Sequence, residues 1–93
     1  TDKGVIALAQ SRSGPNLTNI DLSCNEEITN ASVIEIARRC PQLKYIHLDE
    51  CRNIMNVVTC KKALRQGCPH VTIEGLYWDV DYINTINNLQ LQF

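Results

Sequence analysis

The chain has 93 residues, of which 44% are hydrophobic, and a formal net charge of −1. This length allows one domain with a modest core. The near-neutral charge argues against the basic surface on which nucleic-acid binding depends. No apolar run approaches the roughly 18 residues that span a bilayer. We therefore expect a single domain over residues 1–93 that binds another protein, not nucleic acid, and does not insert into a membrane.

The first predicted element is a short amphipathic helix within residues 1–11, capped by Thr1 or Asp2. Its candidate inner residues are Val5, Ile6, Leu8 and Ala9. A strand is expected over residues 17–23. Ile28, after the turn that follows this strand, is predicted to pack into the core.

The next segment repeats this order. Thr29 or Asn30 is expected to cap a second helix that ends at Cys40. Its inner residues are Val33, Ile34, Ile36 and Ala37, and its solvent-facing residues are Glu35, Arg38 and Arg39. A second strand over residues 43–49 follows, with Ile54 as its core residue.

The apolar residues of the two strands match position for position. Leu43 lies 26 residues after Leu17, and the other matched pairs are Ile20 with Ile46 and Leu22 with Leu48. A period of about 20–29 residues, with Asn or Cys after the last apolar position, is typical of leucine-rich repeats. Asn25 and Cys51 occupy that position. We therefore predict an α/β fold, a leucine-rich-repeat solenoid with a short parallel sheet on the concave face and helices on the convex face.

The third repeat departs from the pattern. Asn56 is expected to cap its helix, with Val57, Val58, Cys60, Ala63 and Leu64 as inner residues. In the strand predicted over residues 71–76, Glu74 falls on an apolar position. Because burying a carboxylate is costly, a local shift should bring Ile73 into that position instead. Residues 1–76 then hold about three repeats, and residues 77–93 form a C-terminal cap or tail, in which Tyr77 and Trp78 cover the core or anchor a partner.

The cysteines predict buried, reduced thiols. Their number is odd and none forms a C-x-x-C pair: they are Cys24, Cys40, Cys51, Cys60 and Cys68. This pattern fits neither a disulfide framework nor a zinc site, so we expect no disulfide, no metal and no cofactor. Reduced thiols favour an intracellular protein, cytoplasmic or nuclear, with mitochondria as the alternative.

The candidate binding residues lie between the apolar positions of the strands and therefore on the open, concave face of the sheet. They are Asn19, Asp21, Ser23, Tyr45, His47 and Asp49. In the predicted register Asp21 lies beside His47, a pair of the kind that general-base catalysis uses. No nucleophile shares their row, so we expect partner binding and not an enzyme. A thiol-dependent or His/Asp-dependent enzyme is kept as a remote alternative.

Several short motifs narrow the type of repeat. Cysteine precedes proline at residues 40–41 and 68–69, and Cys51 holds the Asn position. Together with the sequences at residues 1–4 and 28–30, these motifs resemble the cysteine-containing leucine-rich repeats of F-box proteins. The resemblance implies a curved array that holds a substrate for ubiquitin transfer within a larger complex. Similar short arrays occur in mitochondrial assembly proteins related to a coupling factor of ATP synthase, which implies an assembly scaffold as the alternative.

Overall fold

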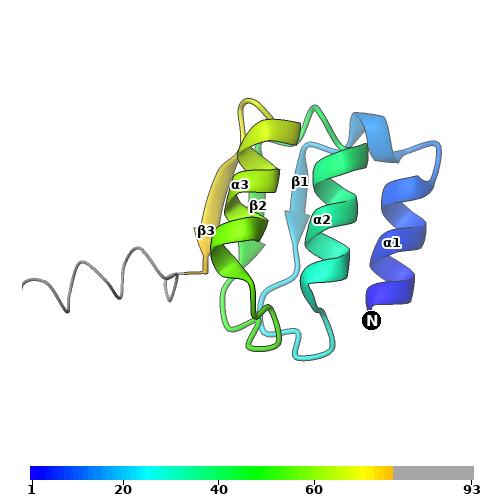
Figure 1. Ribbon diagram of the computed structural model, residues 1–93. Coiled ribbons are helices and arrows are strands. Elements are labelled where there is room, and N and C mark those ends of the chain that lie inside the picture. The colour runs from blue at the N-terminus through cyan, green and yellow to red at the C-terminus, as the bar shows by residue number, and fades with distance from the viewer. Residues whose placement is uncertain (77–93) are drawn as a thin grey trace, which may run out of the picture.

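The computed structural model describes residues 1–76; the predicted cap or tail at residues 77–93 lies outside the described residues. The elements in chain order are α1 (Asp2–Gln10), the short 3-10 helix η1 (Gly14–Asn16), β1 (Asn19–Asp21), α2 (Asn30–Arg39), β2 (Tyr45–Leu48), α3 (Val57–Gly67) and β3 (Thr72–Gly75). Over residues 1–76 the fold is thus α/β, with three α-helices and a short three-stranded sheet (Figure 1).

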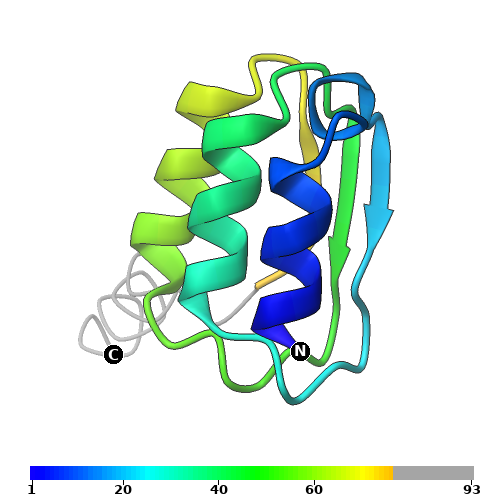
Figure 2. The ribbon, with the colours of Figure 1, turned by 90° about the vertical axis from the view of Figure 1, so that its right-hand side faces the viewer.

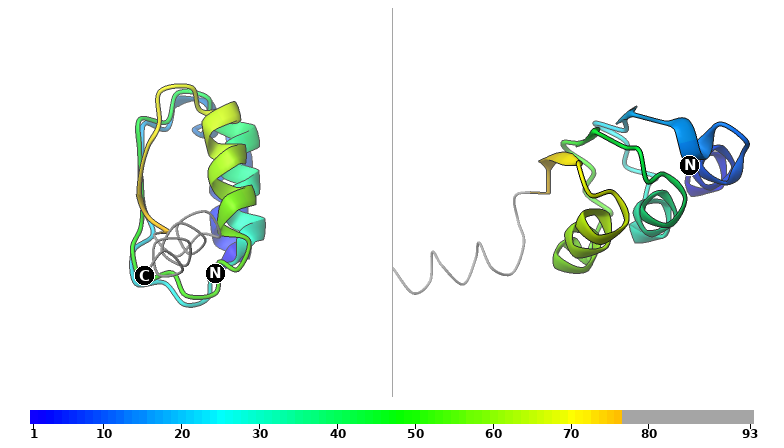
Figure 3. Two further views of the ribbon diagram at one scale, coloured as in Figure 1. Left: turned by 60° about the vertical axis from the view of Figure 1, so that its left-hand side comes forward. Right: turned by 90° about the horizontal axis from the view of Figure 1, so that it is seen from above.

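The molecule has two layers. The three helices lie side by side in one layer, and the strands form the other (Figures 2 and 3). The strand order is β1-β2-β3, and both pairs of neighbours are parallel. The predicted parallel sheet, with helices on its other side, is confirmed.

The register of the sheet places one isoleucine from each strand in a single row. Ile46 on the central strand pairs with Ile20 on one side and Ile73 on the other. Ile46 is fully buried and Ile20 is 7% exposed, whereas Ile73 is half-buried. The predicted shift that brings Ile73 into the core and leaves Glu74 exposed is therefore confirmed.

The strands are shorter than predicted over residues 17–23, 43–49 and 71–76. Before each of the first two strands, the chain makes a tight turn: the Leu17 N–H donates to the Gly14 carbonyl and the Leu43 N–H to the Cys40 carbonyl, both at 3.2 Å. After those strands, the backbone turns into the left-handed region at Cys24 and Glu50, where φ is 61° at both residues. Turns at both ends confine the ladder to three or four residues per strand.

Most of the predicted core residues are buried. Ile28, Val33, Ile36, Cys40, Cys60, Leu64 and Cys68 all have an exposed fraction of 5% or less, and Ile54 is 5% exposed. Leu8 was predicted to lie inside and is 46% exposed. Within the described chain, α1 is the outermost helix and packs against α2 on one side only. Ala9 is buried there, and Leu8 is not covered.

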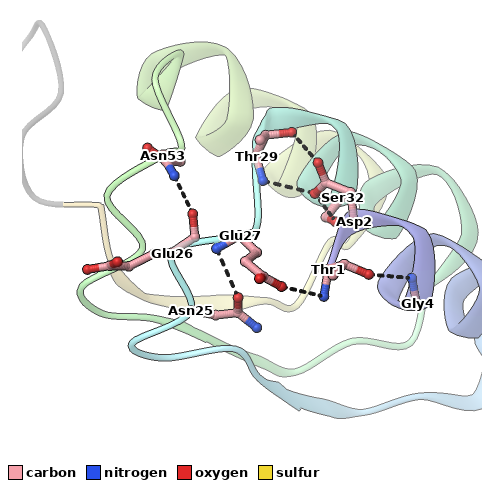
Figure 4. A network of polar contacts seen from close by, with 9 residues as sticks. All are labelled: Thr1, Asp2, Gly4, Asn25, Glu26, Glu27, Thr29, Ser32 and Asn53. Carbon is pink, nitrogen blue, oxygen red and sulfur yellow. Dashed lines mark hydrogen bonds and ion pairs between the residues drawn. The ribbon is translucent and has the colours of Figure 1, made fainter.

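A carboxylate at the start of α1 holds the start of α2 (Figure 4). Asp2 accepts the backbone N–H of Thr29 at 2.9 Å, the Thr29 hydroxyl at 2.5 Å and the Ser32 hydroxyl at 2.5 Å. Ser32 is fully buried, so Asp2 satisfies a hydroxyl that water does not reach. Partial burial acts to raise the pKa of Asp2, but the hydrogen bonds from Ser32 and Thr29 outweigh it, and the pKa is lowered.

The predicted caps are confirmed for the first two helices. The Thr1 side chain accepts the Gly4 N–H, and the Thr29 side chain accepts the Ala31 N–H. Asn56 stands at the N-cap position of α3 but makes no side-chain cap hydrogen bond. Instead, Asn30 on the preceding helix accepts the Met55 N–H at 2.9 Å and the Asn56 N–H at 3.2 Å.

Glu35 does not face solvent as predicted. Its side chain is only 12% exposed, because Arg39 at 2.9 Å, Gln10 at 3.3 Å and Arg38 at 3.4 Å all donate to its carboxylate. Of these contacts, the hydrogen bond from Arg39 contributes most to lowering the pKa of Glu35. Gln10 belongs to α1, so this carboxylate also joins two helices.

Candidate protein-binding surface on the sheet

The predicted binding residues on β1 and β2 lie together on the face of the sheet that points away from the helices. The register pairs Asn19 with Tyr45 and Asp21 with His47. Asn19, Asp21 and Tyr45 are exposed and His47 is half-buried, whereas the alternating Ile20 and Ile46 are buried. This alternation is the expected consequence of a strand with one covered face. We call this surface the open face.

The third strand adds two residues to the open face that the sequence analysis did not include. Thr72 pairs with Tyr45, and Glu74 pairs with His47, so each row gains a third member from β3. Both residues are exposed. The sequence signal for them was the shift that places Ile73 inward, because residues on either side of an inward residue must point outward.

Two rings form the centre of the open face. The ring centroids of Tyr45 and His47 are 6.3 Å apart, with an angle of 21° between the ring planes, and the rings stack. Tyr45 is 47% exposed, which is high for a large side chain with apolar character. Tyrosine offers a rigid contact area and a hydroxyl, and it is common among residues that dominate protein interfaces.

His47 lies between two carboxylates, Asp21 on β1 and Glu74 on β3. The Nδ1 atom of His47 is 3.7 Å from a carboxylate oxygen of Glu74, an ion pair when the imidazole is protonated. The sequence analysis identified Asp21 as the neighbour of His47 but did not identify Glu74. The row is therefore more acidic than expected.

Asp21 is fixed by the turn that follows its strand. The backbone N–H of Ser23 donates to the Asp21 carboxylate at 3.0 Å. This bond contributes most to lowering the pKa of Asp21, followed by the bond from the Ser23 hydroxyl and, more weakly, the charge of His47. Asp21 is therefore an ionised, preformed acceptor on the open face.

Ser23 and Asp49 lie at the ends of their strands and are half-buried. The Asp49 carbonyl accepts the Cys24 N–H at 2.7 Å, which joins the two turns. The Ser23 hydroxyl is engaged by Asp21, as described above, and not by His47. Among residues 1–76, then, the histidine is paired with a carboxylate and stacked on a tyrosine. This arrangement offers polar and aromatic contacts to a partner.

The five cysteines are free thiols, with Cys24 exposed and the other four buried. Burial raises the pKa of Cys68 to about 11 and also raises those of Cys40, Cys51 and Cys60. The Cys51 thiol lies 2.9 Å from the Leu22 carbonyl, and the Cys68 thiol lies 3.2 Å from the Cys40 carbonyl. Each of these thiols thus joins one turn of the chain to the preceding one.

Two searches for other kinds of site were made over residues 1–76. No group of three or more His, Cys, Asp or Glu side chains in this part of the chain is arranged to hold a metal ion. None of its helices combines the length and apolar character needed to cross a bilayer. Comparison of the whole chain with protein-family models, with curated proteins and with solved structures found no match.

Proposed function

We propose that this chain is a short leucine-rich-repeat solenoid that binds another protein through the open face of its sheet. The observation that carries the proposal is the set of side chains exposed there, which come from three parallel strands in register. A stacked Tyr45–His47 pair lies among them, with Asp21 and Glu74 on either side. Such sheets give repeat proteins an extended binding surface, and exposed aromatic residues supply anchors for a partner.

The periodicity of the backbone supports the solenoid. The non-glycine residues with positive φ are Cys24, Glu50 and Leu76, which lie 26 residues apart. Non-glycine residues seldom adopt this conformation. Its return at one fixed spacing, at the end of each strand, supports three copies of one structural unit.

Within this proposal, the resemblance to F-box leucine-rich repeats suggests that the partner is a substrate held for ubiquitin transfer. The alternative is a scaffold for assembly in mitochondria. The two functions share the open face and differ in what the full-length gene encodes before Thr1. An F-box segment there supports the first, and an arginine-rich amphipathic leader supports the second.

Site-specific crosslinking tests the proposal. A photoreactive benzoylphenylalanine is placed at Tyr45 in one sample and, as a matched control, at Arg65, an exposed residue of α3 on the helical side. We expect the probe at position 45 to crosslink a discrete partner in cell extract, and the probe at position 65 not to do so. Tyr45→Ala should abolish retention of that same partner on the immobilised 93-residue chain. Equal crosslinking from both positions would contradict the proposal.

A further inference from the structure

A second candidate site lies at the end of the described structure, beside the carboxyl end of β3. It is a pocket of about 390 Å³. Its buried apolar lining consists of Leu48, Cys51, Ile54 and Leu76. Three charged residues also line it: Asp49, Glu50 and Arg52. A small apolar pocket with polar groups around it is the usual form of a site that takes a single side chain or a small ligand.

The pocket exists because a glycine takes a position that leucine holds in the other strands. Leu22 and Leu48 are matched in the sequence pattern, and the register pairs Leu48 with Gly75. Glycine has no side chain to cover Leu48 on that side. A Cβ at Gly75 would lie 2.5 Å from the carbonyl carbon of Leu48, and φ at this glycine is 94°. The backbone therefore forbids a larger residue, and the hollow is a built feature of the strand end.

The charges around the pocket leave an excess of negative charge. Arg52 and Glu50 form an ion pair at 3.1 Å and offset each other. Asp49 also lines the pocket, and Glu74 directly precedes Gly75. In the described chain, the recorded partner of the Glu74 carboxylate is His47, and no lysine or arginine forms an ion pair with Asp49 or Glu74.

We propose that this pocket binds one apolar side chain of a partner protein that carries lysine or arginine next to it. The apolar side chain covers Leu48, Cys51 and Ile54, which gains the free energy of removing their surface from water. The neighbouring cation pairs with Asp49, and the charge complementarity selects the partner. The site shares Asp49 with the open face but is otherwise separate, so it stands independently of the binding proposed there.

Three capped pentapeptides test the proposal against the whole 93-residue chain. Their sequences are Gly-Lys-Leu-Lys-Gly, Gly-Glu-Leu-Glu-Gly and Gly-Lys-Ser-Lys-Gly, and binding is followed by amide NMR shifts. We expect the lysine–leucine peptide to shift the amides of Leu48, Gly75 and Leu76 with at least a ten-fold lower Kd than either of the others. Changing the charges removes the electrostatic complementarity, and changing leucine to serine removes the apolar contact.

Substitutions at Asp49 locate the cation. Asp49→Lys should raise the Kd of the lysine–leucine peptide at least five-fold, and the milder Asp49→Asn should raise it two- to three-fold with the fold retained. Glu26→Lys makes the same charge change at an exposed loop residue that does not line the pocket, and it should leave the Kd unchanged.

Three results would overturn the proposal. Equal Kd values for the three peptides, or shifts confined to other residues, would mean that the pocket does not select this chemistry. Shifts of the pocket amides that grow with protein concentration in the absence of peptide would identify a second copy of the chain as the occupant. Nuclear Overhauser effects between Leu48 and side chains of residues 77–93 would identify the chain itself as the occupant.

Discussion

The junction between the first and second structural units differs from the junction between the second and third. At the first junction, leucine and isoleucine face each other along matched strands, and a charged residue, Asp2, joins the two helix starts. At the second, Ile73 is only half-buried and Gly75 replaces leucine. A neutral residue, Asn30, then joins the helices. The same backbone arrangement is thus held by more apolar burial and a stronger polar contact at one junction than at the other.

The central row of isoleucines should show the largest difference. Ile46→Ala removes a fully buried side chain that both junctions share and should lower the free energy of unfolding by about 2–5 kcal/mol. Ile73→Ala removes a half-buried side chain of the second junction and should cost less than half as much. Urea denaturation of both variants measures the two values. Equal losses would mean that the third strand is packed as tightly as the second.

The polar contacts at the helix starts provide the next comparison. Asp2→Ala leaves the buried Ser32 hydroxyl without its acceptor and should cost about 1–3 kcal/mol. Asn30→Ala exposes two backbone N–H groups of residues that are themselves exposed, where water replaces the lost acceptor, and should cost about 0.5–1.5 kcal/mol. Thermal and urea unfolding at pH 7 give both numbers.

The Asp2 contribution should also depend on pH. Its folded-state pKa is lowered, so its stabilising effect is fully present above the unfolded value of about 3.9 and is lost as the pH falls through the folded value. The difference in stability between the wild type and Asp2→Ala should therefore narrow below about pH 4. A difference that stays constant down to pH 2 would show that the carboxylate charge is not what stabilises this junction.

Two glycines separate backbone strain from helix propensity. Gly75→Ala places a methyl group against the backbone of Leu48 at a positive φ and should lower stability by about 1–3 kcal/mol. Gly4→Ala, in α1, meets no heavy atom closer than 3.9 Å and should raise stability by about 0.5–1 kcal/mol. Opposite signs in urea denaturation are the expected result. A stabilised Gly75→Ala would mean that β3 relaxes and that the pocket can be filled.

The thiols give the smallest effect, a difference in rate and not in stability. Cys24, at the first turn, is exposed, and its counterparts in the fold interior are buried with raised pKa values. Because the thiolate is the reactive form, a thiol reagent should modify one group quickly and four slowly in the folded chain. In denaturant without reductant, five groups should react. Three or fewer would reveal disulfides that the odd count argued against.

The sequence alone was enough to predict the parallel strands, the inward residues Ile20 and Ile46, and the open-face neighbours Asp21 and His47. These features follow from a local rule, because alternation along a strand and a matched period between strands decide which side chains meet. The shift that buries Ile73 was also predictable, since placing Glu74 in the core would be too costly.

Only the tertiary structure decided the contacts between side chains that are distant in sequence and share no pattern. Asp2 holds Ser32, Glu35 draws in Gln10, and Glu74 reaches His47 because helices and strands are stacked at particular distances. The exposure of Leu8 has the same origin: its spacing suits a buried helix face, but burial requires a neighbour on that side. The pocket at Gly75 likewise arises from what lies opposite Leu48, which periodicity in one strand does not specify.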